Sequence, residues 1–219
     1  MEKLKRFHGS ELELRDNESG LPDISGIGSP FFNADIAGTT YELFDGVAER
    51  IMPGAYDDLS EDPGAAEIYS TFNHNDMQPL GRVSAGTLDL MVDEVGLRYQ
   101  VKASRTSYYK DLVESMRRGD VHGSSITFVP LKQRWIEGDD DGPDVREITL
   151  LRLYEVGPVV NPAYTATTSM VRSADAIEAE KSHQQWRQEL TQQRLAKAMA
   201  GSGKMIEGIW RRGEINRLA

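Results

Sequence analysis

The chain has 219 residues, of which 39% are apolar and 8% aromatic, and it carries a formal net charge of −10. This length suits one well-packed domain with an appendage. The lack of cysteine excludes disulfides, thiol catalysis and cysteine-ligated metals. No apolar run approaches the roughly 18 residues of a membrane helix, and none follows the charged start MEKLKRFHGS. We therefore expect a cytosolic protein with no membrane contact.

The charge is distributed unevenly along the chain. Residues 173–219 contain eight Lys or Arg and six Asp or Glu, a balance of +2. Residues 1–172 therefore hold 17 basic and 29 acidic residues, a balance of −12. An acidic surface repels phosphate backbones, so we do not expect nucleic acid as the main ligand. The simplest interpretation is that the acidity keeps this part soluble.

The sequence of the N-terminal third predicts short strands separated by turns. Apolar runs at residues 12–15, 24–32 and 48–52 predict strands. Pro53 then suits the first turn of a short helix, because proline has no amide hydrogen to lose there. The stretch AEIYSTFNHN predicts another strand, which ends at His74.

The stretch GTLDLMVDEVGLRYQVKAS predicts a β-hairpin with one buried face, because apolar and polar residues alternate on both sides of a DEVG turn. The residues expected on the buried face are Leu88, Leu90, Val92, Leu97, Tyr99, Val101 and Ala103.

The next stretch, SYYKDLVESMRRGD, changes to the period of a helix. Tyr108, Leu112, Val113 and Met116 fall on one stripe, and Gly119 suits the C-terminal end of the helix. VHGSSITFV then predicts a strand. QRWI and DVREITLLRLYEV predict a second hairpin across the acidic loop EGDDDGPD.

Beyond Val171 the composition changes again. The segment is rich in Ala, Gln, Glu and Arg, which favours a helix, and we expect Gly201–Gly203 to interrupt it as a hinge. We therefore divide the chain into a β-rich body at residues 1–172 and a helical tail at residues 173–219.

Three stretches fail the tests of the sites they resemble. The acidic loop has Ile148 where a calcium loop needs its twelfth-position glutamate. GSGK at residues 201–204 lacks two residue types that a phosphate-binding loop requires. GSSIT has Thr127 in place of the second glycine of a nucleophile elbow, and it precedes a strand instead of a helix. We therefore expect no metal, no nucleotide and no α/β-hydrolase.

Two adjacent serines, Ser124 and Ser125, could still supply a nucleophile on another scaffold. Such a serine needs a base within hydrogen-bond reach, and the base needs an orienting partner. Alternation along a strand places Ser125 on one face with Thr127, and Ser124 on the other face with Ile126.

His74 is the best candidate base among the four histidines. His8 lies near the terminus, His183 lies in the tail, and His122 has an odd spacing from Ser125 that points it to the opposite face. His74 ends a predicted strand between Asn residues that suit a turn, although a histidine in such a place is more often structural.

Glu155 is the candidate orienting group, because it ends the apolar strand LLRLYEV and should be partly buried. A buried carboxylate needs a paired charge or hydrogen bonds. The alternative is a structural ion pair with Arg152 or Arg172, and the residues alone do not decide between the two.

Four stretches resemble, in order and rough spacing, the tailed-phage prohead (capsid maturation) serine proteases. They are ISGIGSPFF…AERIMPGAYDDL, FNHNDMQPLGRV, RRGDVHGSSITF and YEVGPVVNPAYTAT. The hairpin DEVGLRYQVKAS resembles that family too, and the resemblance covers about residues 20–170. It implies a fold like that of the herpesvirus assemblin proteases, which is mainly β with flanking α-helices and forms a compact β-barrel.

The resemblance also implies the residues of a serine protease site. The F-N-H motif of the family falls on His74, and its G-x-S-x-x-F motif falls on Ser125. The acidic residue that precedes the Pro-Ala pair falls on Glu155. Family members often carry glycine where Thr127 stands and a larger apolar residue where Ser124 stands.

The implied activity is that of a serine endopeptidase that cleaves scaffold segments from the major capsid protein, and then itself, inside the immature capsid in the host cytoplasm. The reaction needs no cofactor. It needs an oxyanion donor, for which Arg82, Ser124 and backbone amides near Ser125 are candidates. The tail at residues 173–219 would be a targeting segment that self-cleavage removes.

Two further points stay open at this level. Whether the chain forms a homo-oligomer does not follow from the sequence. The same fold could also serve as a catalytically vestigial capsid assembly or scaffolding protein.

Overall fold

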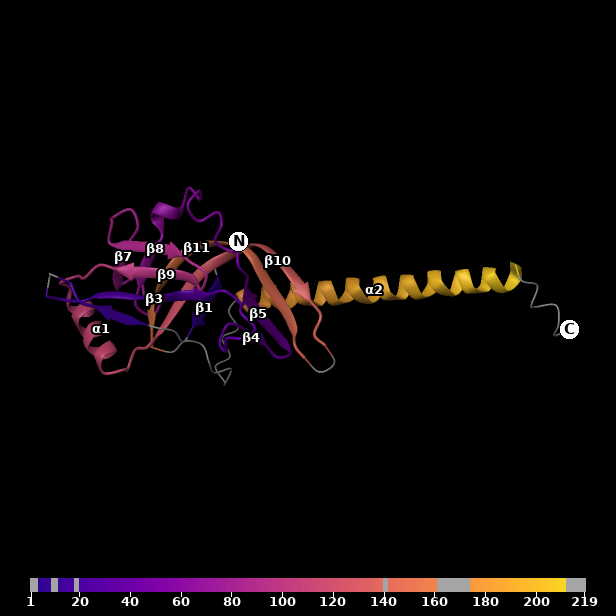
Figure 1. Cartoon of the computed structure of the whole chain (residues 1–219), viewed down its shortest axis with the longest axis horizontal. Coiled ribbons are helices and arrows are strands. Elements are labelled where there is room, and N and C mark those ends of the chain that lie inside the picture. The colour runs from indigo at the N-terminus through magenta and orange to yellow at the C-terminus, as the bar shows by residue number, and fades with distance from the viewer. Residues whose placement is uncertain (1–3, 9–11, 18–19, 140–141, 161–173, 212–219) are drawn as a thin grey trace. The chain divides into compact units, whose positions relative to one another are not determined.

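The computed structural model describes the chain over residues 4–8, 12–17, 20–139, 142–160 and 174–211. The chain forms two compact units, Met1–Val171 and Arg172–Ala219. The first unit is built mainly from strands in two sheets (Figure 1). The prediction of a mainly β fold with helices is therefore confirmed, but the sheets do not close into the expected barrel.

The larger sheet carries the strands that position the candidate site. These strands are β1 (Leu4–His8), β4 (Tyr41–Phe44), β5 (Val47–Ile51), β6 (Tyr69–Thr71), β7 (Pro79–Arg82), β10 (Gly123–Ile136) and β11 (Asp144–Val159). Their order is β1-β10-β11-β5-β4, and β6 pairs with both β11 and β7. β10 and β11 form the predicted second hairpin, which is antiparallel and is the most prominent pair of strands in Figure 1.

The smaller sheet contains the other predicted hairpin. Its strands, in spatial order, are β2 (Glu13–Arg15), β3 (Asp23–Pro30), β9 (Gly96–Val101) and β8 (Leu88–Val92). The predicted alternation is confirmed in β9, where Leu97, Tyr99 and Val101 are buried. In β8 it holds for Leu88, which is buried, and for Leu90, which is partly buried against the core, but Val92 is 41% exposed at the edge of the sheet.

Helix α1 (Ser107–Arg117) matches its predicted range, and Gly119 follows its C-cap with a φ of +81° that suits glycine. Its most buried side chain is Tyr109, whereas the predicted Tyr108 is only partly buried. The hydroxyl of Tyr109 donates a hydrogen bond to the carbonyl of Pro22, which satisfies the polar end of a buried ring.

The hydrophobic core is shared by both sheets and α1. It includes Ile24, Leu97, Tyr99, Tyr109, Ile126, Phe128, Leu151, Leu153 and Val156. Full burial of one such aliphatic or aromatic side chain is worth about 1.5–3 kcal/mol. This core fixes the face of β10 and β11 that points inward, and it leaves the opposite face for polar groups.

Three expected elements differ from the structure. A series of turns follows Pro53 instead of a helix, because Gly54 has a φ of +91° that a helix cannot accommodate. The strand before His74 ends at Thr71, because the residues that follow it turn away in a left-handed conformation.

The third difference lies in the second unit. Helix α2 (Ala174–Arg211) continues without a break through Gly201–Gly203, where a hinge was expected. Glycine costs about 1 kcal/mol relative to alanine within a helix, which weakens a helix without ending it. Neither α2 nor any other helix in the described part of the chain is long and apolar enough to cross a membrane.

Candidate active site

His74 lies in a short loop that follows β6. Asn73 and His74 have φ values of +54° and +56°, in the left-handed region that non-glycine residues rarely adopt. Two hydrogen bonds of Asn73 hold this conformation. Its backbone amide donates to the carbonyl of Pro158 over 3.0 Å, and its side-chain oxygen accepts from the backbone amide of Val160 over 2.8 Å. The loop is thereby attached to the end of β11.

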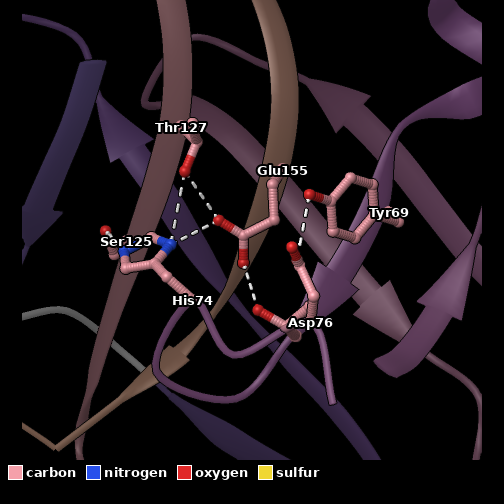
Figure 2. Close-up of polar contacts among 7 residues, drawn as sticks. Tyr69, His74, Asp76, Ser125, Thr127 and Glu155 are labelled. Carbon is pink, nitrogen blue, oxygen red and sulfur yellow. Dashed lines mark hydrogen bonds and ion pairs between the residues drawn. The ribbon is translucent and has the colours of Figure 1, made fainter. Parts of the chain in front are cut away.

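A second contact holds the other side of the same loop. The Tyr69 hydroxyl donates to the carboxylate of Asp76 over 3.2 Å. Burial raises the pKa of Tyr69, and the nearby negative charges of Asp76 and Glu155 raise it further, so the hydroxyl keeps its proton. Figure 2 shows this pair beside the cluster around His74.

Ser124 and Ser125 point to opposite faces of β10, as alternation predicted. Ser125 faces His74, whereas the hydroxyl of Ser124 lies 3.0 Å from that of Tyr99 on the core side. Burial raises the pKa of Tyr99, so this contact joins two neutral hydroxyls. Both serines are fully buried.

A β-bulge in β11 aims Glu155 at the same face as Ser125. Thr127 pairs with Glu155 across the hairpin, but the next residue of β10 pairs with Leu153, which leaves Tyr154 as the extra residue. Leu153 and Val156 both enter the core although three positions separate them. The bulge therefore shifts the alternation by one residue and directs Glu155 away from the core.

The structure brings His74, Ser125 and Glu155 into one chain of hydrogen bonds, and Figure 2 shows the three side chains together. The Nε2 atom of His74 lies 2.6 Å from the Oγ atom of Ser125. Its Nδ1 atom is hydrogen-bonded to the Oε2 atom of Glu155. The side chains of His74 and Glu155 are only 7% and 3% exposed, so water screens this contact weakly.

Within the described residues, neither arginine that was considered as an ion-pair partner is seen to bind Glu155. Arg152 donates instead to Asp62 over 2.7 Å, and Arg172 lies outside the described residues. The backbone amide of Gly64, and Arg152 in addition, lower the pKa of Asp62 and keep it charged for this pair.

Two threonines that the sequence did not identify as functional also bind Glu155. Thr71 donates to Oε1 and Thr127 donates to Oε2, each over 2.8 Å. For Thr127 the only indication in the sequence was strand alternation, which places it on the same face of the strand as Ser125. Thr71 lies 84 positions from Glu155, and no local pattern indicates the contact.

Gly157 is a further residue that the sequence did not identify. A β-carbon on Gly157 would lie 2.1 Å from the carbonyl oxygen of Thr71, a distance that real β-carbons do not show. Gly157 pairs with Ser125 across the hairpin. Only glycine therefore lets β6 approach β11 closely at the level of the serine.

The structure places Arg82 in an exposed ion pair. Its guanidinium donates to the carbonyl and to the carboxylate of Glu67 over 2.8 and 2.9 Å, and it lies 5.1 Å from the ring centre of Tyr69. Its suggested oxyanion role, like that of Ser124, stays a prediction.

A serine, a histidine and a carboxylate joined in this order are the arrangement found in serine hydrolases. Residues 10–182 match the family described as caudovirus prohead serine protease. This match covers most of the chain, so the chain belongs to the caudovirus prohead serine protease family, as the resemblance in the sequence indicated.

Among solved structures, the chain is similar to the capsid assembly protease gp21 of bacteriophage T4. The two share 14% sequence identity with a TM-score of 0.43, over 73% of this chain and 98% of that one. No curated protein matches the sequence.

Proposed function

We propose that the chain is the serine endopeptidase of capsid maturation, with Ser125 as nucleophile, His74 as general base and Glu155 as its orienting group. The observation that carries this proposal is the 2.6 Å contact between His74 Nε2 and Ser125 Oγ, with the carboxylate of Glu155 on the other ring nitrogen. In this arrangement Nδ1 carries a proton, so Nε2 has a lone pair for the serine proton.

The reaction would proceed through an acyl-enzyme. Ser125 Oγ attacks the peptide carbonyl carbon while its proton moves to His74 Nε2, and the C–N bond breaks as that proton passes to the leaving amine. A water molecule then attacks the ester in the same way and releases the acid product. Glu155 stabilises the positive imidazolium that exists between the two proton transfers.

The tetrahedral intermediates carry a negative oxygen that needs a donor, an effect worth about 3–4 kcal/mol. The hydroxyl of Ser124 points to the other face of β10, toward Tyr99. We therefore favour backbone amides near Ser125 over Ser124 for this role, and Arg82 would have to leave its ion pair with Glu67 to fill it.

The family supports the biological setting of the proposal. The substrates would be the major capsid protein with its scaffold segment and the chain itself, and the reaction would take place inside the immature capsid in the host cell. Residues 173–219 would be a targeting segment that self-cleavage removes. The alternative is a vestigial protease that acts in capsid assembly or scaffolding, and the complete burial of Ser125 favours it.

Serine-directed labelling tests the nucleophile against its neighbour. We expect a fluorophosphonate probe to modify the wild type once, at Ser125, and Ser125→Ala to lose both the labelling and the cleavage of capsid protein followed by mass spectrometry. Ser124→Ala is the matched control: it should keep both and lose about 1 kcal/mol of stability with the Tyr99 hydrogen bond.

Two outcomes would contradict the proposal. If Ser125→Ala still cleaves, the nucleophile lies elsewhere. If the wild type neither reacts with the probe nor cleaves capsid protein while its fold is intact, the vestigial alternative is correct.

A further inference from the structure

The carboxylate of Glu155 receives three hydrogen bonds in a site that is almost closed to water. Thr71 binds Oε1, and Thr127 and His74 bind Oε2. Glu155 as a whole is 2% exposed. A buried carboxylate with a single donor would gain by taking up a proton, whereas several donors favour its charged form. The two threonines therefore supply two of the three hydrogen bonds to the Glu155 carboxylate.

The two hydroxyls also fix the direction of the carboxylate. Thr71 approaches from β6 and Thr127 from β10, so each carboxylate oxygen is held from a different strand. Both threonines are buried, with 1% and 7% exposure, and a β-branched side chain has few rotamers to exchange. With Oε1 bound to Thr71, Oε2 is the oxygen that faces His74.

Thr127 has a second contact that bears on the proton of His74. Its Oγ1 atom lies 3.3 Å from His74 Nδ1 as well as 2.8 Å from Glu155 Oε2. A hydroxyl has one proton, and an ionised carboxylate can only accept, so Thr127 gives its proton to Glu155. Its oxygen then presents a lone pair to Nδ1, which favours the tautomer with the proton on that nitrogen.

We propose that Thr71 and Thr127 are positioning residues for the proposed hydrolysis: they hold the carboxylate of Glu155 turned toward His74, and Thr127 reinforces the histidine tautomer that presents the Nε2 lone pair to Ser125. This inference rests on the proposed function for its kinetic consequences. The tautomer of the resting protein can be measured without any turnover.

The test compares Thr127→Val, which removes the hydroxyl at nearly constant volume, with Thr127→Ser, which retains it. We expect Thr127→Val to lower kcat for a capsid-derived peptide by about 10- to 100-fold at unchanged KM, the effect of losing one hydrogen bond to a charged group. Thr127→Ser should restore most of kcat. Thr71→Val should give a smaller loss, of about 3- to 10-fold, because Thr71 does not contact the histidine.

Nitrogen-15 NMR of histidine-labelled protein gives the second readout, with His74→Gln to assign the signals. In the wild type we expect a protonated Nδ1 and an unprotonated Nε2, and in Thr127→Val the two shifts should move toward each other. The thermal unfolding of each variant shows that the fold is retained.

The outcomes separate this inference from the proposed function. Unchanged nitrogen shifts in Thr127→Val overturn the tautomer role, and a Thr127→Ser variant as slow as Thr127→Val shows that the hydroxyl is not the cause. A wild type with the expected tautomer but no hydrolysis would overturn the proposed function and leave the resting positioning of His74 established.

Discussion

Gly157→Ala is expected to inactivate the protein and to destabilise it. The added β-carbon would meet the backbone of Thr71, 2.1 Å from the oxygen and 3.2 Å from the carbon of its carbonyl, and backbone cannot rotate away as a side chain can. β6 would have to move from β11 and would carry the His74 loop with it. A displacement of about 1 Å at the reacting groups costs on the order of 100-fold in rate, and overpacking costs about 1–3 kcal/mol of stability.

The measurement is peptide hydrolysis together with unfolding in denaturant. Gly64→Ala is the matched control, because Gly64 is exposed and its added β-carbon would meet only the side chain of Asp62, at 3.3 Å. A Gly157→Ala variant with wild-type activity would show that the distance between β6 and β11 does not govern the site.

Glu155→Gln is expected to lower kcat by about 1,000- to 10,000-fold with little change in the fold. The glutamine side chain has the same shape as that of glutamate, but its NH2 group donates hydrogen bonds where a carboxylate oxygen accepted them. With the NH2 group toward His74, the proton of the ring moves to Nε2, which can then no longer accept from Ser125. The threonine hydroxyls can rotate to accommodate the amide, so we expect inactivation without unfolding.

Steady-state kinetics on the same peptide tests this expectation. Glu114→Gln serves as the control, because Glu114 is exposed on α1 and the same chemical change there should leave kcat unaltered. A Glu155→Gln variant that keeps more than about a tenth of wild-type kcat would remove Glu155 from the proposed triad.

The parts of the fold that follow from local alternation could be predicted from the sequence. The two hairpins, α1 and the opposite faces of Ser124 and Ser125 all depend on neighbours within a few residues. The predictions of a helix after Pro53 and of a hinge at Gly201–Gly203 were wrong: the structure has turns at the first place and an unbroken helix at the second. Single proline and glycine residues bias the backbone conformation without deciding it.

The candidate site could be predicted only in its three central residues, which motifs of a family indicated. The contacts of Thr71 and the tight approach at Gly157 depend on β6 meeting β11, which are far apart in the chain. The left-handed conformation of His74 depends on hydrogen bonds between Asn73 and the end of β11. Such long-range pairings leave no periodic trace in the sequence.

The bulge at Tyr154 has a consequence for comparing this chain with others. In this chain one residue, Tyr154, separates the apolar run that ends at Leu153 from the acid Glu155. In a relative that lacks the bulge, the acid would follow the apolar run directly. An alignment anchored on that run would then assign the role of Glu155 to a neighbouring core position. The spacing from the acid forward to Gly157 is the dependable anchor, because steric contact with β6 fixes the glycine.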